Sequence, residues 1–276
     1  CHGMHFDIML GSRDQRRFPQ TATPFSLASK QGDSMTAIAV VTGAAGGMGR
    51  AISDRLIDDG LHVVGVDIDG PALLTMAANR DNFSPEVCDL TDAEAIADMF
   101  DRLTDRFGGV DALVNNAGTC FMSDFPDIPA HELDRQMAIN FSSAFHCCQG
   151  AVKAMAGRPG VRKIVNISSN GAYNFDVFDP PHYRASKAAM DTLTKDLARR
   201  YARDKIACNS IAPAMTETPL FKVLTEDVLA RAISAMPHGH ALQPDQIAAW
   251  VSFLISPMGD VSSGNIIILN QGRDVR

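Results

Sequence analysis

The segment IAVVTGAAGGMG, residues 38–49, decides the fold. Its first four residues are apolar, as expected of a strand that is buried on both faces of a parallel sheet. The glycines that follow favour a tight turn. Residues 47–59 then have the pattern of a helix, which Gly60 is placed to end. The segment therefore predicts a strand, a glycine-rich turn and a helix in succession.

The same alternation continues almost to the end of the chain. Strands are predicted at residues 38–41, 61–67, 83–88, 110–114, 163–167, 206–211 and 266–269. Helices are predicted at residues 47–59, 71–79, 91–107, 130–155, 182–201 and 244–255, the third of them opening with the capping box Thr91-Asp92-Ala93-Glu94. This order indicates an α/β fold, a doubly wound (Rossmann) parallel sheet of about seven strands flanked by helices on both faces. No linker divides it, so residues 35–276 are predicted to form a single domain.

Residues 1–34 differ from the rest of the chain. They combine arginines and prolines with many serines and threonines, show no sustained period and lack the apolar core of a secretory signal. We predict a disordered N-terminal extension that precedes Met35. An organellar presequence is the alternative, which Asp7, Asp14 and Asp33 disfavour.

Composition disfavours several classes of function. The 276 residues carry a net charge of -7 and contain no block of basic residues, which argues against binding to nucleic acids or to a membrane surface. The longest apolar run, residues 247–255, is too short to cross a bilayer. The six cysteines have no metal-ligand spacing, so we expect no metal. They indicate free thiols in a reducing compartment, and hence a cytoplasmic protein.

The glycine-rich turn and Asp67 together predict a dinucleotide site. Glycines let the backbone approach a pyrophosphate, which the N-H groups and the dipole at the start of the helix attract. Asp67 ends the second predicted strand, where a carboxylate accepts hydrogen bonds from the adenosine ribose and repels a 2′-phosphate. Because Ile68 rather than a basic residue follows, and Ala44 and Ala45 occupy the turn, we predict NAD in preference to NADP.

Tyr183 and Lys187 are four residues apart and therefore share one face of a predicted helix. The usual pKa of a tyrosine is near ~10. A neighbouring ammonium favours the phenolate and lowers this pKa, so the pair is a candidate general acid/base. A solvated helix edge can have the same spacing, and the pair alone does not decide between the two.

Further motifs follow one another in a fixed order. They are Thr42-Gly43-xxx-Gly47-x-Gly49, Asp89-Leu90, Asn115-Asn116-Ala117-Gly118, Asn140, Ile167-Ser168-Ser169, Tyr183-xxx-Lys187 and residues 209–218. In these motifs and their spacing, residues 36–272 resemble the short-chain dehydrogenase/reductase family, in its short single-domain branch. The resemblance implies an enzyme that transfers a hydride between a nicotinamide dinucleotide and an alcohol or carbonyl compound.

The resemblance implies four catalytic residues: Asn140, Ser169, Tyr183 and Lys187. Tyr183 would exchange a proton with the substrate oxygen. Lys187 would hold the nicotinamide ribose and lower the pKa of Tyr183. Ser169, preferred over Ser168, would hydrogen-bond the substrate oxygen and set its position. Asn140 would hold a water that links Lys187 to solvent.

The resemblance also implies which residues bind the cofactor. On the adenosine and pyrophosphate side they are Gly43, Gly47, Met48, Gly49, Asp67, Ile68, Asp89, Leu90, Asn116, Ala117 and Gly118. Near the nicotinamide they are Tyr183, Lys187, Pro213, Thr216 and Thr218.

Three positions depart from the family pattern. Ala214 replaces a usual glycine, Thr216 replaces a frequent isoleucine, and Asn270-Gln271-Gly272 replaces a usual pair of glycines. The first two bear on the placement of the nicotinamide. The third is expected to bear on the subunit interface rather than on chemistry.

The pocket for the substrate is predicted to have apolar walls. The loop of residues 171–182 carries the rings of Tyr173, Phe175 and Phe178. Residues 219–236 place apolar side chains at helical spacing, a pattern that a helix packed on the core would also have.

Anchors for a charged substrate are few in this region, where Lys222, His238 and His240 are the candidates. We therefore expect a hydrophobic secondary alcohol or ketone, such as a cyclic, terpenoid, steroid-like or aryl compound. An NADPH-dependent 3-oxoacyl-thioester reductase is the alternative enzyme, which Asp67 disfavours. A catalytically silent dinucleotide-binding scaffold is the alternative outside enzymes, which the complete catalytic set disfavours.

Relatives of this length usually form homotetramers, so the resemblance implies a homo-oligomer. The interface would use the predicted helices at residues 130–155 and 182–201. Such an interface would bury Cys147 and Cys148.

Overall fold

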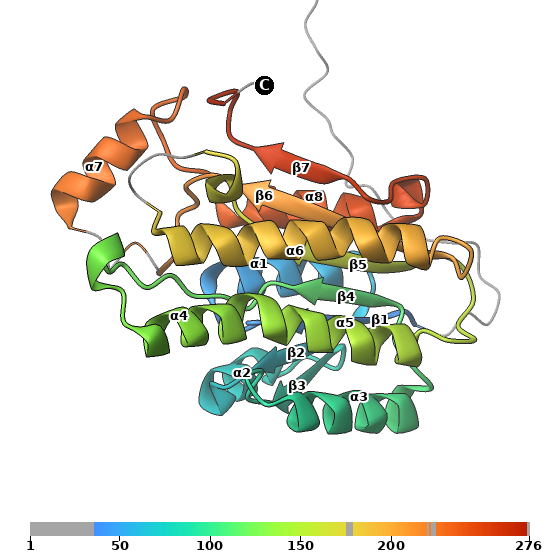
Figure 1. Cartoon of the computed structure of the whole chain (residues 1–276). Coiled ribbons are helices and arrows are strands. Elements are labelled where there is room, and N and C mark those ends of the chain that lie inside the picture. The colour runs from blue at the N-terminus through green and yellow to red at the C-terminus, as the bar shows by residue number, and fades with distance from the viewer. Residues whose placement is uncertain (1–35, 175–178, 220, 222–224, 275–276) are drawn as a thin grey trace, which may run out of the picture.

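The computed structural model describes residues 36–174, 179–219, 221 and 225–274 (Figure 1). The predicted N-terminal extension lies outside the described residues. So do two of the three predicted pocket rings, Phe175 and Phe178, and the candidate anchor Lys222.

The described residues contain one seven-stranded parallel sheet in the order β3-β2-β1-β4-β5-β6-β7, which confirms the predicted fold. The strands are β1 (Ile38–Thr42), β2 (His62–Asp67), β3 (Phe83–Val87), β4 (Ala112–Asn115), β5 (Arg162–Ile167), β6 (Ile206–Pro213) and β7 (Ile266–Leu269). The helices are α1 (Gly47–Asp58), α2 (Gly70–Ala77), α3 (Ala93–Phe107), α4 (Ala130–Met137), α5 (Ser143–Ala154), α6 (Pro181–Arg200), α7 (Glu226–Ser234) and α8 (Pro244–Ile255). Within the described part of the chain, none of the helices is long and apolar enough to cross a membrane.

Two apolar cores lie on the two faces of the sheet. Residues of α3, α5 and α6, which Figure 1 shows in front of the sheet, fill one core, and residues of α1, α2 and α8 fill the other. Successive residues of β1 serve opposite faces, with Val40 in the first core and Val41 in the second. Burial on both faces explains why the first four residues of this strand are apolar.

The predicted helix at residues 130–155 is interrupted. A π-helical turn, Ala138–Ser142, joins α4 to α5. This turn carries Asn140, which is fully buried. The Asn140 amide donates to Thr119 O at 2.9 Å and to Ser186 Oγ at 3.1 Å. Single π-turns of this kind occur often at functional sites.

The start of α3 differs from the predicted capping box. The carboxylate of Asp92 accepts hydrogen bonds from the backbone N-H groups of Glu94 and Ala95, so Asp92 is the N-cap. The hydroxyl of Thr91 donates instead to Asp89 Oδ1 at 2.7 Å. The prediction that Thr91 caps the helix is therefore wrong. The spacing of Thr91 and Glu94 did not reveal that Asp89 and Asp92 offer competing local hydrogen bonds.

Cys147 and Cys148 lie inside the subunit. Their exposed fractions are 0% and 2%, and both pack in the core that α5 covers. The prediction that a subunit interface buries them is wrong, since the fold of one chain already does so. The five described cysteines are free thiols, as predicted.

The carboxyl ends of the parallel strands meet at one end of the molecule. Between β1 and β4 the order of the strands reverses, which makes this end the usual place for a ligand in a doubly wound sheet. In Figure 1, α7 and the first turn of α4 lie at this end, to which the strand arrows point.

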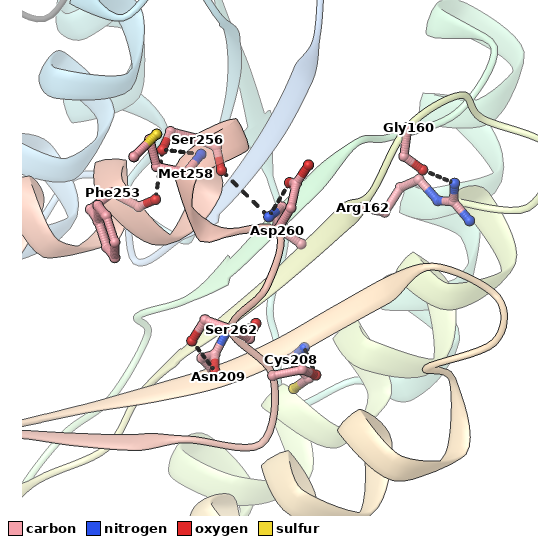
Figure 2. Close-up of polar contacts among 11 residues, drawn as sticks. Gly160, Arg162, Cys208, Asn209, Phe253, Ser256, Met258, Asp260 and Ser262 are labelled. Atoms are coloured by element: carbon pink, nitrogen blue, oxygen red, sulfur yellow. Dashed lines mark hydrogen bonds and ion pairs between the residues drawn. The ribbon is translucent and has the colours of Figure 1, made fainter.

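A buried lysine closes the other end of the sheet. Lys163, the second residue of β5, has a side chain that is 3% exposed. Its ammonium lies 2.7 Å from Asp260 Oδ1 and 3.4 Å from Ser256 O. Figure 2 labels Ser256 and Asp260 at this contact, near the hydrogen bond between Asn209 and Ser262. A buried ammonium depends on such partners, because water does not replace them.

Asp260→Ala is expected to lower the free energy of unfolding by about 2 kcal/mol, because it leaves the Lys163 ammonium buried with a single distant acceptor. The loss falls short of that for a fully buried pair because the Asp260 side chain is 41% exposed. Denaturant-induced unfolding measures the change. Asp101→Ala, an exposed position on α3, is the control and should change stability by less than about 0.5 kcal/mol. Equal midpoints for the two variants would contradict a stabilising role of the pair.

Candidate active site

A glycine turn connects β1 to α1 at the carboxyl end of the sheet. Gly43 has φ +64°, a conformation that side chains disfavour, and a Cβ on Gly49 would overlap the carbonyl oxygen of Gly43. Gly46 precedes α1, and no side-chain hydrogen bond caps this helix. The N-H groups at the start of α1 are therefore available to an anionic ligand.

A long groove begins at this turn and follows the carboxyl ends of the strands. It brings together the residues predicted to bind the cofactor on the adenosine and pyrophosphate side: Gly43, Gly47, Met48, Gly49, Asp67, Ile68, Asp89, Leu90, Asn116, Ala117 and Gly118, with Thr218 at its edge. Sequence reasoning missed further lining residues, which include Thr91, His131, Arg135 and Ile139. Three of these belong to α4 and the π-helical turn, which are distant in the sequence from the glycine turn.

Asp67 has a structural contact that the sequence did not predict. Its Oδ2 accepts a hydrogen bond from the backbone N-H of Ala45 at 3.0 Å, and its Oδ1 accepts one from Asp69 at 3.1 Å. The carboxylate thus holds the glycine turn while it also lines the groove. A carboxylate has about four acceptor sites, so two of them are still available to ribose hydroxyls.

Asn116 offers a second acceptor to the groove. Its amide nitrogen donates to Thr42 O at 3.0 Å and to Gly43 O at 3.1 Å. Its Oδ1 is buried and has no partner among the described residues. A buried acceptor without a donor, next to an uncapped helix start, fits a ligand that carries both hydroxyl and phosphate groups. The groove therefore suits a dinucleotide.

Lys187 lies on α6, one helical turn after Tyr183. Its side chain is buried, and Nζ donates to Ile167 O at 2.8 Å. Burial lowers the pKa of Lys187 to about 8, and the nearby carboxylate of Asp191 opposes this change. Near neutral pH most of these side chains are thus still ammonium ions.

Tyr183 lines the same pocket as Ser169, the residue that follows Ser168 after β5, and the two side chains are close enough for the serine to lower the pKa of the phenol. Burial raises the pKa of Tyr183, the nearby carboxylate of Asp179 raises it further, and Ser169 opposes both. Without a bound cofactor, burial of the phenol therefore decides the direction of the shift. The lowering of the Tyr183 pKa by Lys187 stays a prediction.

Asn140 and Lys187 approach each other across Gly118. A Cβ on Gly118 would lie 3.3 Å from Lys187 Nζ and 3.4 Å from Asn140 Oδ1. The same Oδ1 accepts a hydrogen bond from Thr119 N at 2.8 Å. The structure thus brings together all four predicted catalytic residues. Asn140 lies near Lys187 and Ser169 lies near Tyr183, and α6 carries both Lys187 and Tyr183.

Asp191 is a residue of the site that sequence reasoning missed. It lies four residues after Lys187 on α6, and its carboxylate accepts hydrogen bonds from three hydroxyl groups. The donors are Ser210 at 2.6 Å, Tyr173 at 2.8 Å and Ser168 at 2.9 Å. Its signal was the four-residue spacing that continues from Tyr183 through Lys187. Since Ser168 is engaged by Asp191, Ser169 is the serine whose hydroxyl reaches Tyr183.

A second pocket opens beside Ser169 and Tyr183 and adjoins the groove at Met48 and Thr218. Its apolar walls include Met122, Met215, Phe221, Val228 and Ala232, and its polar lining includes Asn170, Asn174, Asp179 and Arg273. The residues predicted near the nicotinamide, Pro213, Thr216 and Thr218, line it as well, as does Ala214. The hydroxyl of Thr216 donates to Ala214 O at 2.9 Å.

Some of the pocket residues differ from the prediction. The hydroxyl of Tyr173 bonds Asp191, and its ring is not part of the pocket lining. His238 and His240 are exposed and do not line the pocket either. Arg273, which the sequence did not suggest, is the cation among the described lining residues.

The turn at Asn270-Gln271-Gly272 precedes Arg273, which lines this pocket. Its expected role at the subunit interface stays a prediction. Gln271 accepts a hydrogen bond from His238 N at 2.9 Å and donates to His240 O at 3.1 Å. After Arg273, the carboxylate of Asp274 accepts hydrogen bonds from two other lining residues, Asn170 at 3.0 Å and Asn174 at 2.9 Å.

Comparison with known proteins agrees with this geometry. A family model described as enoyl-(acyl carrier protein) reductase matches residues 43–274. A probable short-chain type dehydrogenase/reductase of Bradyrhizobium diazoefficiens is 33% identical over 85% of this chain and 86% of its own length. A cis-4-hydroxycyclohexanecarboxylate dehydrogenase of Sinomonas cyclohexanicum is 34% identical over 85% and 95%. A short chain dehydrogenase of Burkholderia cenocepacia, solved in complex with NADP, is 27% identical with a TM-score of 0.79 over 87% of this chain and 99% of its own. The chain therefore belongs to the short-chain dehydrogenase/reductase family.

Proposed function

We propose that this protein is an NAD-dependent oxidoreductase that interconverts hydrophobic secondary alcohols and ketones. One observation carries the proposal. Ser169 and Tyr183 lie together at a pocket with largely apolar walls, and that pocket adjoins a groove that suits a dinucleotide. The name of the Sinomonas relative describes a cyclic secondary alcohol that also carries a carboxylate, so it supports a cyclic secondary alcohol as substrate and does not bear on the rest of the class.

Each residue of the site has a role in this reaction. When bound, NAD supplies or accepts the hydride at the substrate carbon. Ser169 donates a hydrogen bond to the substrate oxygen and fixes its position. Tyr183 removes the proton of the alcohol during oxidation, or donates a proton to the carbonyl oxygen during reduction.

The positive charge of Lys187 favours the phenolate of Tyr183 once cofactor and substrate exclude water from the site. Lys187 also donates to the ribose hydroxyls beside the nicotinamide. Asn140, which shares the space over Gly118 with Lys187, holds a water through which protons pass between the site and solvent. The start of α1 holds the pyrophosphate, and Asp67 and Asn116 accept hydrogen bonds from the adenosine ribose.

NADPH-dependent reduction of 3-oxoacyl thioesters is the second candidate. Arg273 favours it, because a cation in the pocket lining suits the anionic groups of such substrates. The NADP complex of the Burkholderia relative also favours it. Asp67 favours NAD, because its carboxylate would repel a 2′-phosphate. The tetramer stays a prediction from the family resemblance, and the cytoplasmic location stays a prediction from the cysteines.

Oxidation of a panel of alcohols with NAD, followed by the absorbance of the reduced cofactor, tests the proposal. We expect turnover of cyclic and aryl secondary alcohols. Activity confined to polyols or to charged acyl thioesters would contradict the proposed substrate class.

Tyr183→Phe is expected to lower kcat by about 10²-fold to 10⁴-fold, because the variant lacks the group that transfers the proton. Binding of the dinucleotide, measured by fluorescence titration, should change little, since the phenyl ring preserves the packing. Tyr201→Phe, at the opposite end of α6 and outside the pocket lining, is the control. Unchanged turnover in Tyr183→Phe would show that another group carries the proton.

Asp67→Asn is expected to raise kcat/KM with NADP relative to NAD by about tenfold, because a neutral amide no longer repels the 2′-phosphate. The amide oxygen still accepts from Ala45, so the glycine turn should be preserved. Steady-state rates with both cofactors measure the ratio. A wild-type enzyme that prefers NADPH would refute this interpretation of Asp67.

Asp191→Asn is expected to lower the pH above which kcat falls. The Asp191 carboxylate opposes the lowering of the Lys187 pKa from its usual value, so its neutralisation lets that pKa fall further from about 8. The ammonium is then lost at a lower pH as pH rises. A pH profile of the variant, beside that of the exposed control Asp196→Asn, measures the shift. An unchanged profile would exclude coupling of Asp191 to Lys187.

A further inference from the structure

Two acidic side chains lie close to Ser169 and Tyr183, and they differ in their partners. Asp191 accepts three hydrogen bonds from hydroxyl groups. The carboxylate of Asp179, which is partly buried, accepts none from the described residues. Its attractive neighbour is Arg184, whose Nε donates to the backbone oxygen of Asp179 at 2.7 Å rather than to the carboxylate.

Burial without donors destabilises a carboxylate, and it raises the pKa of Asp179. Acceptors of this kind are uncommon in folded proteins, and where they occur they usually have a function. No contact within the described residues explains the carboxylate of Asp179. Its place in the pocket supplies an explanation.

Asp179 and Ser169 border the same small space. Both line the pocket, together with Tyr183. A Cβ on Gly171 would overlap Asp179 Oδ2 and would lie 3.2 Å from Ser169 Oγ. Glycine at position 171 thus makes room for the carboxylate beside the serine. The carboxylate is also close enough to Tyr183 to raise its pKa.

We propose that Asp179 determines specificity by binding a second hydrogen-bond donor of the substrate, a hydroxyl or ammonium group one or two carbons from the reacting carbinol. The inference rests on the proposed function, in which Ser169 and Tyr183 hold the carbinol oxygen. The second donor must be near that oxygen because Asp179 and Ser169 share one space. Met122, Phe221 and Val228 form apolar walls of the same pocket, against which an apolar remainder of the substrate would pack. The preferred substrate is therefore an apolar diol or amino alcohol.

The test compares alcohols that differ by one hydroxyl group. Oxidation of 1,2-cyclohexanediol, 1,3-cyclohexanediol and cyclohexanol by the full-length enzyme with NAD gives three values of kcat/KM. We expect wild type to prefer at least one diol over cyclohexanol. Asp179→Leu, of similar size and without acceptors, should reduce this preference about tenfold or more, the effect expected from loss of one charge-assisted hydrogen bond.

Asp179→Asn keeps one acceptor oxygen and should lie between wild type and Asp179→Leu. It also provides a measurement if the leucine variant does not fold. Asp101→Asn, which removes an exposed charge on α3, should leave the preference unchanged. Thermal unfolding confirms that each variant is folded.

Each outcome of this experiment decides the question. A diol preference that falls in the two Asp179 variants, and not in Asp101→Asn, supports the inference. Active variants with an unchanged ratio between diol and cyclohexanol overturn it, and leave the proposed function intact. A wild-type enzyme that oxidises no alcohol overturns the proposed function and the inference together.

Discussion

The buried ammonium of Lys187 is the constraint on which the arrangement of the site depends. A charge in the protein interior is stable only with polar partners, and Ile167 O at the end of β5 accepts its hydrogen bond. This contact holds the middle of α6 against the carboxyl end of β5. Tyr183, one helical turn earlier, is thereby placed beside Ser169, which follows the same strand.

Asp191 extends this constraint to neighbouring segments. Its three donors come from the end of β5, from the loop that follows and from β6, so a single carboxylate connects α6 to each of them. Because every member of the network has a partner, it favours one arrangement of these segments over others. Among the described residues, Asp179 has no comparable set of donors. Asp191 therefore supports the structure of the site, whereas Asp179, which lines the pocket, is proposed to bind the substrate.

The turn after the first strand and the turn after the last strand reach different parts of the candidate site. The glycine turn after β1 forms the groove, whereas the turn after β7 reaches the second pocket through the contacts of Asp274 with Asn170 and Asn174. Those asparagines belong to the segment between Ser169 and Tyr183. The position of the last described residues is thus coupled to the segment that carries the catalytic serine, and a change in either one bears on the shape of the pocket.

The sequence by itself determined the order of strands and helices, the glycine turn and those groove residues that belong to the motifs, because these follow from local properties: apolar runs, backbone freedom and the spacing of motifs. It did not determine the π-helical turn at Asn140, the three hydrogen bonds of Asp191, or the presence of Asp179 and Arg273 in the pocket. Only the tertiary structure decided these. Whether a buried polar group has a partner depends on distances between segments far apart in the chain, and no local pattern records them.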